Sequence, residues 1–433
     1  MNQTAYLYTL GCRLNQADSA AVADDLASHG FTIVSEPDGQ TALIVVNSCS
    51  VTATAARKSR QTLRALRRRF PQAFIVIMGC DATVEQADIF PEADAVVPNP
   101  RPAPLSQLLP TPLARRPEPL AAAPGDFHDD FVCEGAGLFA DRTRANLKVQ
   151  DGCNFFCSYC IVPHTRGPAR SRNFADVLRE ARELIARGHR EIVVSGVNVT
   201  TYDNGGRDLA DLLEALLELD DTTRYRLGSA EPGPVIAKVI RLMAHTPRLC
   251  RFLHLPLQYG EDSILRAMRR HYDTAQFRDV ALEATELIPG LCLGTDLIVG
   301  FPGETDATFE SCRRYLEELP LGLMHVFGYS PRPGTPAATM AGRPASTLVD
   351  QRLQTLLDLS AAKARDFARS QLGTTVQVLV ETANPASGWS DNYLHVTLQP
   401  PYDHLPPNTL CHARLVADDA DDRHVRGVLA DQT

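Results

Sequence analysis

Three cysteines within eight residues constrain this chain more than any other feature. The segment "QDGCNFFCSYC" places Cys153, Cys157 and Cys160 in a C-x3-C-x2-C spacing. Three thiolates this close can ligate three irons of a cubane [4Fe-4S] cluster and leave the fourth iron without a protein ligand. An open iron can do chemistry on a bound small molecule, whereas a cluster sealed by four cysteines only transfers electrons. The alternative is a zinc site, which prefers paired C-x2-C units with a fourth ligand, and His164 could supply one.

The cysteine segment resembles the radical S-adenosylmethionine signature, whose residue before the last cysteine is usually aromatic; here it is Tyr159. The resemblance implies that S-adenosylmethionine chelates the open iron through its amino and carboxylate groups. It also implies an external one-electron reductant, because the reduced cluster splits the sulfonium into methionine and a 5'-deoxyadenosyl radical. The cofactor supplies that chemistry, and the protein positions the radical and excludes competing reactions.

Length and composition indicate a multidomain soluble enzyme. A chain of 433 residues is too long for one core and predicts roughly two to four domains. The net charge of −9 gives no global basic signature, so RNA binding requires local patches. The N-terminus lacks a signal-peptide pattern and no long apolar run occurs, so we expect no membrane partner. Eleven cysteines spread over a long chain favour a reducing cytoplasmic location and metal-ligating thiolates over disulfides.

The first hundred residues alternate short apolar runs with helix-like stretches. The expected strands are 6–10, 43–46 and 74–78, and the expected helices are 15–29 and 52–70. This alternation predicts an α/β fold with a doubly wound parallel sheet. A cysteine follows each strand, namely Cys12, Cys49 and Cys80. Because ligands bind outside the carboxyl ends of such strands, we expect these three thiols to converge on a second cluster. Buried structural cysteine is the alternative.

The phrases "TLGCRLNQADS" and "VNSCSVTATAARKSRQ" resemble the methylthiotransferase N-terminal domain. That resemblance implies an auxiliary [4Fe-4S] cluster whose open iron holds the sulfur that is methylated and delivered to substrate. The phrases are close to the branch that modifies threonylcarbamoyladenosine in tRNA. The Arg13–Gln16 sequence after Cys12 fits neither the "GCQMN" start of the isopentenyladenosine branch nor the "GCPKN" start of the ribosomal-protein branch.

We expect four segments: a methylthiotransferase N-terminal domain at 1–110, a proline- and alanine-rich linker at 111–140, a radical S-adenosylmethionine core at 141–370 and a small β-barrel at 371–433. Six expected strands fit the open (βα)6 barrel of radical S-adenosylmethionine enzymes, at 145–150, 191–195, 225–229, 252–255, 292–299 and 323–329. Function in such barrels gathers at the carboxyl ends of the strands. The cysteine loop follows the first of these strands, as that rule requires.

Other strand ends match the family pattern, and the resemblance implies that their side chains bind S-adenosylmethionine. The implied cofactor-binding residues are Tyr159, Ser195, Gly196, Asn198, Glu231, Gln258 and Asp296. His254 and the Gly300–Gly303 turn lie in the same motifs. Packed strand ends and tight turns are the alternative reading for each. We expect no catalytic residues beyond the cluster ligands.

Basic residues near the cysteine sets predict contacts with RNA phosphates. Residues 57–69 hold seven basic side chains and no acid, and the candidates there are Arg57, Lys58, Arg60, Arg64, Arg67 and Arg68. The loop "IVPHTRGPARSR" adds Arg166, Arg170 and Arg172, which suit phosphate or the carboxylate of S-adenosylmethionine. A solvated helix face and a solvated loop are the alternatives.

The last stretch alternates in short segments and resembles a TRAM-like β-barrel, which often binds RNA in this family. From Gln371 to Thr433 it has three arginines, no lysines and eight acids, and that charge would repel a phosphate backbone. Trp389 and Tyr393 could stack on bases, but core packing is the favoured use. Cys133, Cys250, Cys292, Cys312 and Cys411 have no expected role beyond packing.

Together these features predict a tRNA methylthiotransferase with two [4Fe-4S] clusters. The resemblance implies one S-adenosylmethionine as methyl donor, another as radical source, and a sulfur source. The substrate would be carbon 2 of N6-threonylcarbamoyladenosine beside the anticodon, at position 37 of tRNA, splayed from the anticodon loop. The alternatives are the same chemistry on isopentenyladenosine or on an aspartate of a ribosomal protein, a metal-stabilised RNA-binding protein, and a redox-sensing iron–sulfur scaffold.

Overall fold

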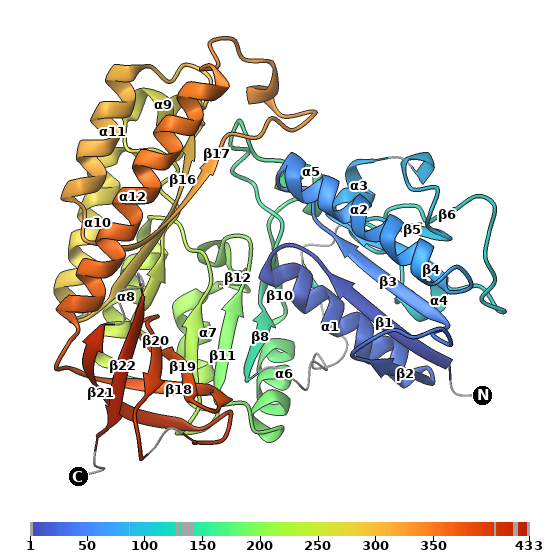
Figure 1. The fold of residues 1–433 in the computed structure, drawn as a ribbon, viewed down its shortest axis with the longest axis horizontal. Helices are drawn as coiled ribbons and strands as arrows, with labels where there is room; N and C mark the ends of the chain where they lie inside the picture. The colour runs from blue at the N-terminus through green and yellow to red at the C-terminus, as the bar shows by residue number, and fades with distance from the viewer. Residues whose placement is uncertain are drawn as a thin grey trace.

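The described residues form a six-stranded parallel sheet, a central region with two three-stranded parallel sheets and two smaller sheets, and a closed β-barrel. Figure 1 shows them as the blue, the green-to-orange and the red regions. The computed structural model describes residues 3–85, 87–126, 130–131, 143–401, 404–418 and 423–430. Cys133 lies outside the described residues. No helix among the described residues is long and apolar enough to cross a membrane.

The N-terminal sheet is wholly parallel, with the strand order β2-β1-β3-β4-β5-β6. Its strands are β1 (Gln3–Thr9), β2 (Phe31–Val34), β3 (Leu43–Ser48), β4 (Phe74–Gly79), β5 (Ala95–Val97) and β6 (Leu120–Ala121). Its helices are α1 (Arg13–Ser28), α2 (Ala53–Arg69), α3 (Cys80–Val84) and α4 (Leu105–Leu108). The predicted doubly wound sheet is confirmed.

Alternate residues of the central strands explain why helices cover both faces. Ile44 and Ile75 pack in one core with Leu63 of α2, whereas Leu43 and Phe74 pack in a second core with α1. Successive side chains of a strand point to opposite faces, so a continuous apolar run supplies both cores. The sequence analysis missed β2, β5 and β6. Since β6 pairs with β5, the segment expected to be only a linker adds an edge strand to this sheet.

The central region contains the six predicted parallel strands. They are β8 (Arg144–Lys148), β11 (Glu191–Ser195), β14 (Arg224–Leu227), β15 (Phe252–His254), β16 (Cys292–Val299) and β17 (Leu321–Gly328). They form two groups of three, β14-β11-β8 and β15-β16-β17. The groups meet through an isolated parallel bridge between Ser229 and His254. The predicted first strand ends early, because Gln150–Asp151 instead forms β9 and pairs with β10 (Arg170–Arg172).

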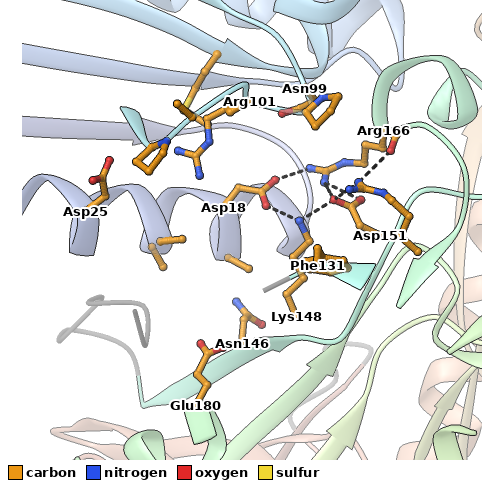
Figure 2. Close-up of a pocket in the computed structure, with 18 residues that line it drawn as sticks. Asp18, Asp25, Asn99, Arg101, Phe131, Asn146, Lys148, Asp151, Arg166 and Glu180 are labelled. Carbon is orange, nitrogen blue, oxygen red and sulfur yellow. Dashed lines mark hydrogen bonds and ion pairs between the residues drawn. The ribbon is translucent and has the colours of Figure 1, made fainter. Parts of the chain in front are cut away.

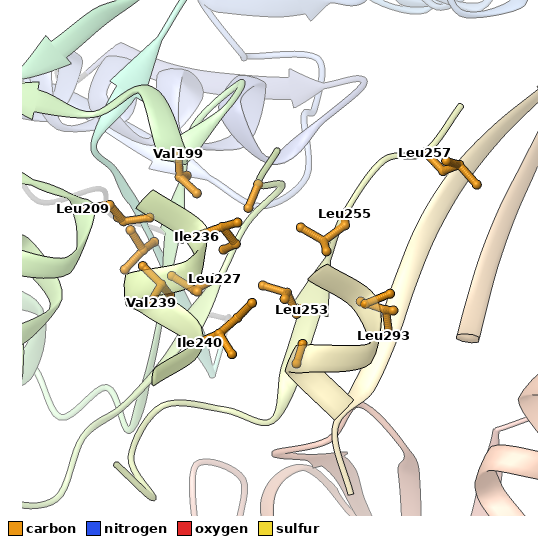
Figure 3. Packing of buried hydrophobic residues seen from close by; sticks show 14 of the residues in the cluster. Val199, Leu209, Leu227, Ile236, Val239, Ile240, Leu253, Leu255, Leu257 and Leu293 are labelled. Carbon is orange, nitrogen blue, oxygen red and sulfur yellow. The ribbon is translucent and has the colours of Figure 1, made fainter. Parts of the chain in front are cut away.

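Helices lie between these strands, and after the last of them, in the sequence, and all but the short α5 bury apolar residues in the core that the strands form. They are α5 (Val162–Arg166), α6 (Phe174–Ala186), α7 (Leu209–Leu217), α8 (Pro234–His245), α9 (Asp262–Ala267), α10 (Thr274–Leu287), α11 (Asp306–Glu318) and α12 (Ser346–Ser370). Figure 3 shows how Ile236 and Ile240 of α8 pack against Leu227 and Leu253 from two strands. The packed layer fixes where each strand ends, and therefore where the residues beyond it lie.

The C-terminal strands close into a barrel in the order β18-β19-β20-β22-β21. They are β18 (Thr375–Ala383), β19 (Ala386–Ser390), β20 (His395–Leu398), β21 (Leu410–Asp418) and β22 (His424–Leu429). Closure pairs every strand and leaves no exposed edge. The predicted small β-barrel is thereby confirmed.

Candidate active site

Cys12, Cys49 and Cys80 lie at one edge of the N-terminal sheet. They follow β1, β3 and β4, which are direct neighbours in the sheet. The strand order reverses between β1 and β3, and ligands of doubly wound sheets bind at such a point. Burial raises the pKa of the Cys49 thiol to about 11, and the nearby Cys80 and Cys12 add to the rise. The predicted convergence of these thiols is therefore present in the fold.

Gly11 and Asn15 shape the backbone around this set. Gly11 has φ 94°, and a Cβ there would lie 2.7 Å from Cys49 Cβ. Asn15 is fully buried, and its Nδ2 donates to Leu10 O and Ser48 O, both at 2.8 Å. One side chain thus ties together the strand ends that precede Cys12 and Cys49. Sequence reasoning missed Asn15, because only the fold brings those two carbonyls together.

Cys153, Cys157 and Cys160 occupy the loop that follows β9. Ser158 within the loop donates from its backbone N to Met268 O at 2.9 Å and accepts from Ala337 N at 2.8 Å. These bonds anchor the loop to segments distant in sequence. Burial raises the pKa of Cys160 to about 12, with the neighbouring Cys157 and Cys153 contributing. The six thiols of both sets are free of disulfides.

The spacing of the sulfur atoms bears on the choice between zinc and an iron–sulfur cluster. Tetrahedral zinc with bonds of about 2.3 Å brings its ligand sulfurs to about 3.8 Å from one another. Among the described residues, the trio of ligand atoms that lies within 4.8 Å is His254, Asp296 and His325, and neither cysteine trio meets that limit. In neither cysteine set, therefore, do all three sulfurs stand at the close spacing of a tetrahedral zinc site. His164 is exposed and faces Phe156 instead.

The two cysteine sets lie on facing parts of the molecule. Helix α5, which follows Cys160, lies beside α3, which begins at Cys80 (Figure 1). Burial raises the pKa of the Cys80 thiol, and Thr165 of α5 is close enough to oppose part of that rise. The first set follows three parallel strands, and the second follows β9, just beyond the parallel strand β8, so the carboxyl ends of strands from both regions face this contact.

Charged side chains fill the space next to that contact and line a cavity of about 380 Å³ (Figure 2). Arg166 Nη2 donates to Asp18 Oδ2 at 2.9 Å, and its Nη1 donates to Asp151 Oδ1 at 3.1 Å. Lys148 bridges the same two carboxylates, at 2.7 Å from Asp18 and 2.6 Å from Asp151. Burial alone would raise the pKa of Asp151, but Lys148 and Arg166 hold it well below its usual range. The carboxylates of Asp18 and Asp151 are thus balanced by the positive charges of Lys148 and Arg166.

The residues predicted to bind S-adenosylmethionine lie near the carboxyl ends of the central strands, but several of them already pair with other side chains of this protein. Arg270 pairs with Glu231 and lies 3.5 Å from Tyr159 Oη. Asp296 Oδ1 accepts from His254 Nε2 and His325 Nδ1, each at 3.2 Å. Arg270 and His325 were missed by the sequence analysis, since neither belongs to a motif that it recognised.

The remaining predicted cofactor residues cluster near β11 and β16. Ser195 and Asn198 are buried, and the Nδ2 of Asn198 lacks a hydrogen-bond partner among the described residues. Gly196 lies against Gln150, whose Oε1 would be 2.9 Å from an added Cβ. Gln258 has φ 71° and donates its backbone N to Asp296 O at 2.8 Å. Their roles toward S-adenosylmethionine remain predictions.

Burial divides the residues predicted to bind RNA into two groups. Arg67, Arg166 and Arg172 are at most 7% exposed and pair with carboxylates. Arg60 pairs with Asp81 and Glu85, and Arg170 lies 3.5 Å from Asp151. The exposed candidates are Arg57, Lys58, Arg64 and Arg68, all on α2. The three buried arginines are engaged by acids, and their contact with RNA stays a prediction.

Trp389 and Tyr393 pack at the junction of the β-barrel and the central strands. Their rings stack at 4.8 Å between centroids, and Tyr393 stacks on Phe252 of β15 at 4.2 Å. This arrangement supports the favoured packing role. Cys250, Cys292, Cys312 and Cys411 are buried, as packing residues are.

Comparisons with known proteins agree with both halves of this arrangement. Residues 147–316 match the model of the radical SAM superfamily, and residues 4–97 match that of the uncharacterized protein family UPF0004. A solved structure of the radical S-adenosylmethionine methyltransferase TsrM from Kitasatospora setae shares the fold, with a TM-score of 0.57, 16% identity, and coverage of 78% of this chain and 77% of that chain.

Sequence relatives cover most of the chain. The threonylcarbamoyladenosine tRNA methylthiotransferase MtaB of Bacillus subtilis is 32% identical over 92% of this chain and 90% of its own length. The tRNA-2-methylthio-N(6)-dimethylallyladenosine synthase of Thiobacillus denitrificans is 36% identical over 89% of this chain and 90% of its own length. Two cysteine sets, two matching family models and relatives of nearly full length lead to one conclusion: the chain belongs to the radical S-adenosylmethionine methylthiotransferase family.

Proposed function

We propose that this protein methylthiolates carbon 2 of N6-threonylcarbamoyladenosine in tRNA. The observation that carries the proposal is the contact between α3, which begins at Cys80, and α5, which follows Cys160. Cys153, Cys157 and Cys160 would hold one [4Fe-4S] cluster, and Cys12, Cys49 and Cys80 the other. When bound with S-adenosylmethionine, an open cluster supplies a radical that abstracts hydrogen from carbon.

The side chains around these sets supply binding, orientation and exclusion of water. The buried loop around Ser158 fixes the first set, and Asn15 fixes the strand ends that precede Cys12 and Cys49. Glu231 and Asp296 are candidates for the polar groups of S-adenosylmethionine at the open end of the barrel. A closed, dry site is required because a primary alkyl radical reacts with almost any neighbouring C–H bond.

Relatives named for tRNA substrates support RNA as the substrate class. The "TLGCRLNQADS" phrase favours the threonylcarbamoyl branch. Relatives named for dimethylallyladenosine match at similar identity, so the same chemistry on that nucleoside is the second candidate. The exposed basic residues of α2 would contact the tRNA backbone, while a sulfur source and a one-electron reductant complete the proposed set of partners.

Nucleoside mass spectrometry of total tRNA from a deletion strain tests the proposal, with wild-type and Cys157→Ala genes added back. We expect loss of the methylthio form of threonylcarbamoyladenosine, restored by the wild type alone. Loss of the methylthio isopentenyl form instead would establish the second candidate. An unchanged tRNA profile would contradict both.

A further inference from the structure

Arg166 joins the two cysteine-bearing regions through bonds on both sides. It lies six residues after Cys160, and its Nη2 donates to Asn15 Oδ1 at 2.6 Å, three residues after Cys12. The same nitrogen donates to Asp18 of α1, and Nη1 donates to Asp151 beside the cysteine loop. Only 3% of Arg166 is exposed, so these bonds form in a low-dielectric setting where they are strong.

Asn15 carries the connection onward to the strand ends of the N-terminal sheet. Its Oδ1 receives Arg166, while its Nδ2 donates to Leu10 O and Ser48 O. Its backbone O accepts from Asn47 Nδ2 at 2.8 Å. Arg166 is therefore connected through the side-chain amide of Asn15 to the backbone near Cys12 and Cys49.

A second buried arginine, Arg172 at the end of β10, shows that burial alone does not explain this arrangement. Arg172 is fully buried and also lies between carboxylates, but its partners Asp176 and Glu180 belong to α6 of the central region. Arg172 therefore stabilises one region, whereas Arg166 spans two. The pair offers a natural comparison.

Resting on the proposed function, we propose that Arg166 and Asn15 form a positioning latch that holds the two cysteine sets at the separation and orientation required for methylthio transfer. The 5'-deoxyadenosyl radical would take the hydrogen from carbon 2 and become 5'-deoxyadenosine. The carbon would then bond to the methylthio sulfur as the bond from that sulfur to iron breaks and one electron stays on the auxiliary cluster, so the carbon must stay within reach of both sites. A misplacement of about 1 Å costs roughly 100-fold in such reactions. The planar guanidinium suits this task, because it donates in several fixed directions at once.

The test separates coupling from the individual half-reactions. Arg166→Gln, Arg166→Lys and Arg172→Gln are purified, reconstituted with iron and sulfide, and assayed with an anticodon stem-loop RNA. The quantity measured is 5'-deoxyadenosine formed per methylthiolated nucleoside. We expect this ratio to rise at least about tenfold in Arg166→Gln, with a partial return in Arg166→Lys. Arg172→Gln should keep the wild-type ratio, whatever its loss of total activity.

Amide hydrogen exchange supplies a readout that does not depend on turnover. In Arg166→Gln, α1 and α5 should exchange faster together, with bound iron unchanged, whereas Arg172→Gln should affect α6. An unchanged ratio together with unchanged exchange in α1 would overturn the proposal. So would a parallel fall of both half-reactions, which a general loss of folding produces.

Asn15→Asp provides a second, nearly isosteric variant. It keeps an oxygen for Arg166 but loses the two donors to the strand-end carbonyls, so it should raise the same ratio. If the two residues act as one unit, the Arg166→Gln/Asn15→Asp double variant should show the same 5'-deoxyadenosine ratio as the single variant with the larger effect. Independent, multiplying effects would contradict the latch. A wild-type enzyme that makes no methylthio nucleoside would refute the proposed function, while the exchange experiment would still test the contact.

Discussion

The Arg270 guanidinium connects Cys157 to Glu231: its Nη1 lies 3.2 Å from Cys157 Sγ, and its Nη2 pairs with the Glu231 carboxylate. It also donates to Pro256 O at 3.1 Å. A residue outside every recognised motif thereby fixes both a predicted cluster ligand and a predicted cofactor residue.

Removal of Arg270 should leave Glu231 buried without a partner. We expect Arg270→Met to lower the free energy of unfolding of the cluster-free protein by roughly 3–5 kcal/mol. Urea titration followed by circular dichroism measures the change. Glu231→Gln added to this variant should recover part of the loss, because the uncompensated charge is gone. No recovery would show that Arg270 stabilises the protein by packing.

Glu191 should hold the β-barrel against the central strands. It pairs with Arg224 and Arg226, which donate onward to Trp389 O at 2.9 Å and Ser390 O at 2.9 Å. We expect Glu191→Gln to lower the free energy of unfolding by about 3 kcal/mol and to make the barrel accessible to limited proteolysis. The control Glu183→Gln, on an exposed pair with Arg179, should cost less than about 1 kcal/mol.

The same carboxylate predicts how acid should affect the protein. Burial would raise the pKa of Glu191, but Arg226 and Arg224 lower it well below its usual range. Glu191 therefore contributes fully to the free energy of unfolding above its pKa in the unfolded protein, about 4.3. This contribution is lost as the pH falls through its lowered pKa in the folded protein. Near-ultraviolet circular dichroism should show a transition below about pH 4 that Glu191→Gln lacks. Identical acid profiles would contradict this assignment.

Iron content should report the two cysteine sets separately. Wild-type protein reconstituted without air should bind about eight irons per chain, and alanine substitution of either complete set should leave about four. Elemental analysis measures this directly. Retention of all the iron after substitution of Cys12, Cys49 and Cys80 would show that these thiols are structural.

The exposed basic face of α2 should contribute to tRNA affinity. Replacing Arg57, Lys58 and Arg68 with serine should weaken binding at least about tenfold. It should also reduce the slope of the logarithm of the binding constant against the logarithm of the salt concentration by about 1 for each lost phosphate contact. Filter binding over a salt series measures both quantities. Arg314→Ser is the control, because Arg314 is exposed on α11, on the opposite side of the molecule from α2 (Figure 1). Equal losses would indicate nonspecific attraction.

Trp389 should not contribute to RNA stacking. Since its ring already stacks on Tyr393, Trp389→Phe should leave tRNA affinity within about twofold. A loss of tenfold or more would mean that the ring reaches RNA. Fluorescence anisotropy with a labelled anticodon stem-loop distinguishes the two results.

Many of the strands and both cysteine sets could be predicted from the local pattern of the sequence. The buried strands β3 and β4 begin with apolar runs, and β16 was predicted as well although Thr295 and Asp296 interrupt its apolar residues. Because ligands bind at the carboxyl ends of parallel strands, Cys12, Cys49 and Cys80 were expected at one edge of the sheet. Short or edge strands such as β5 and β6 carry too few apolar residues to give that signal.

The partners of each charge were decided only by the tertiary structure. Arg166 and Arg172 are alike in sequence, in a loop that reads as basic and exposed, yet both are buried. A charge can be buried when acids from distant elements compensate it, and Asp18 of α1 lies 148 positions from Arg166. Sequence spacing determines which residues share a strand end, whereas packing between the sheets determines which of those ends meet.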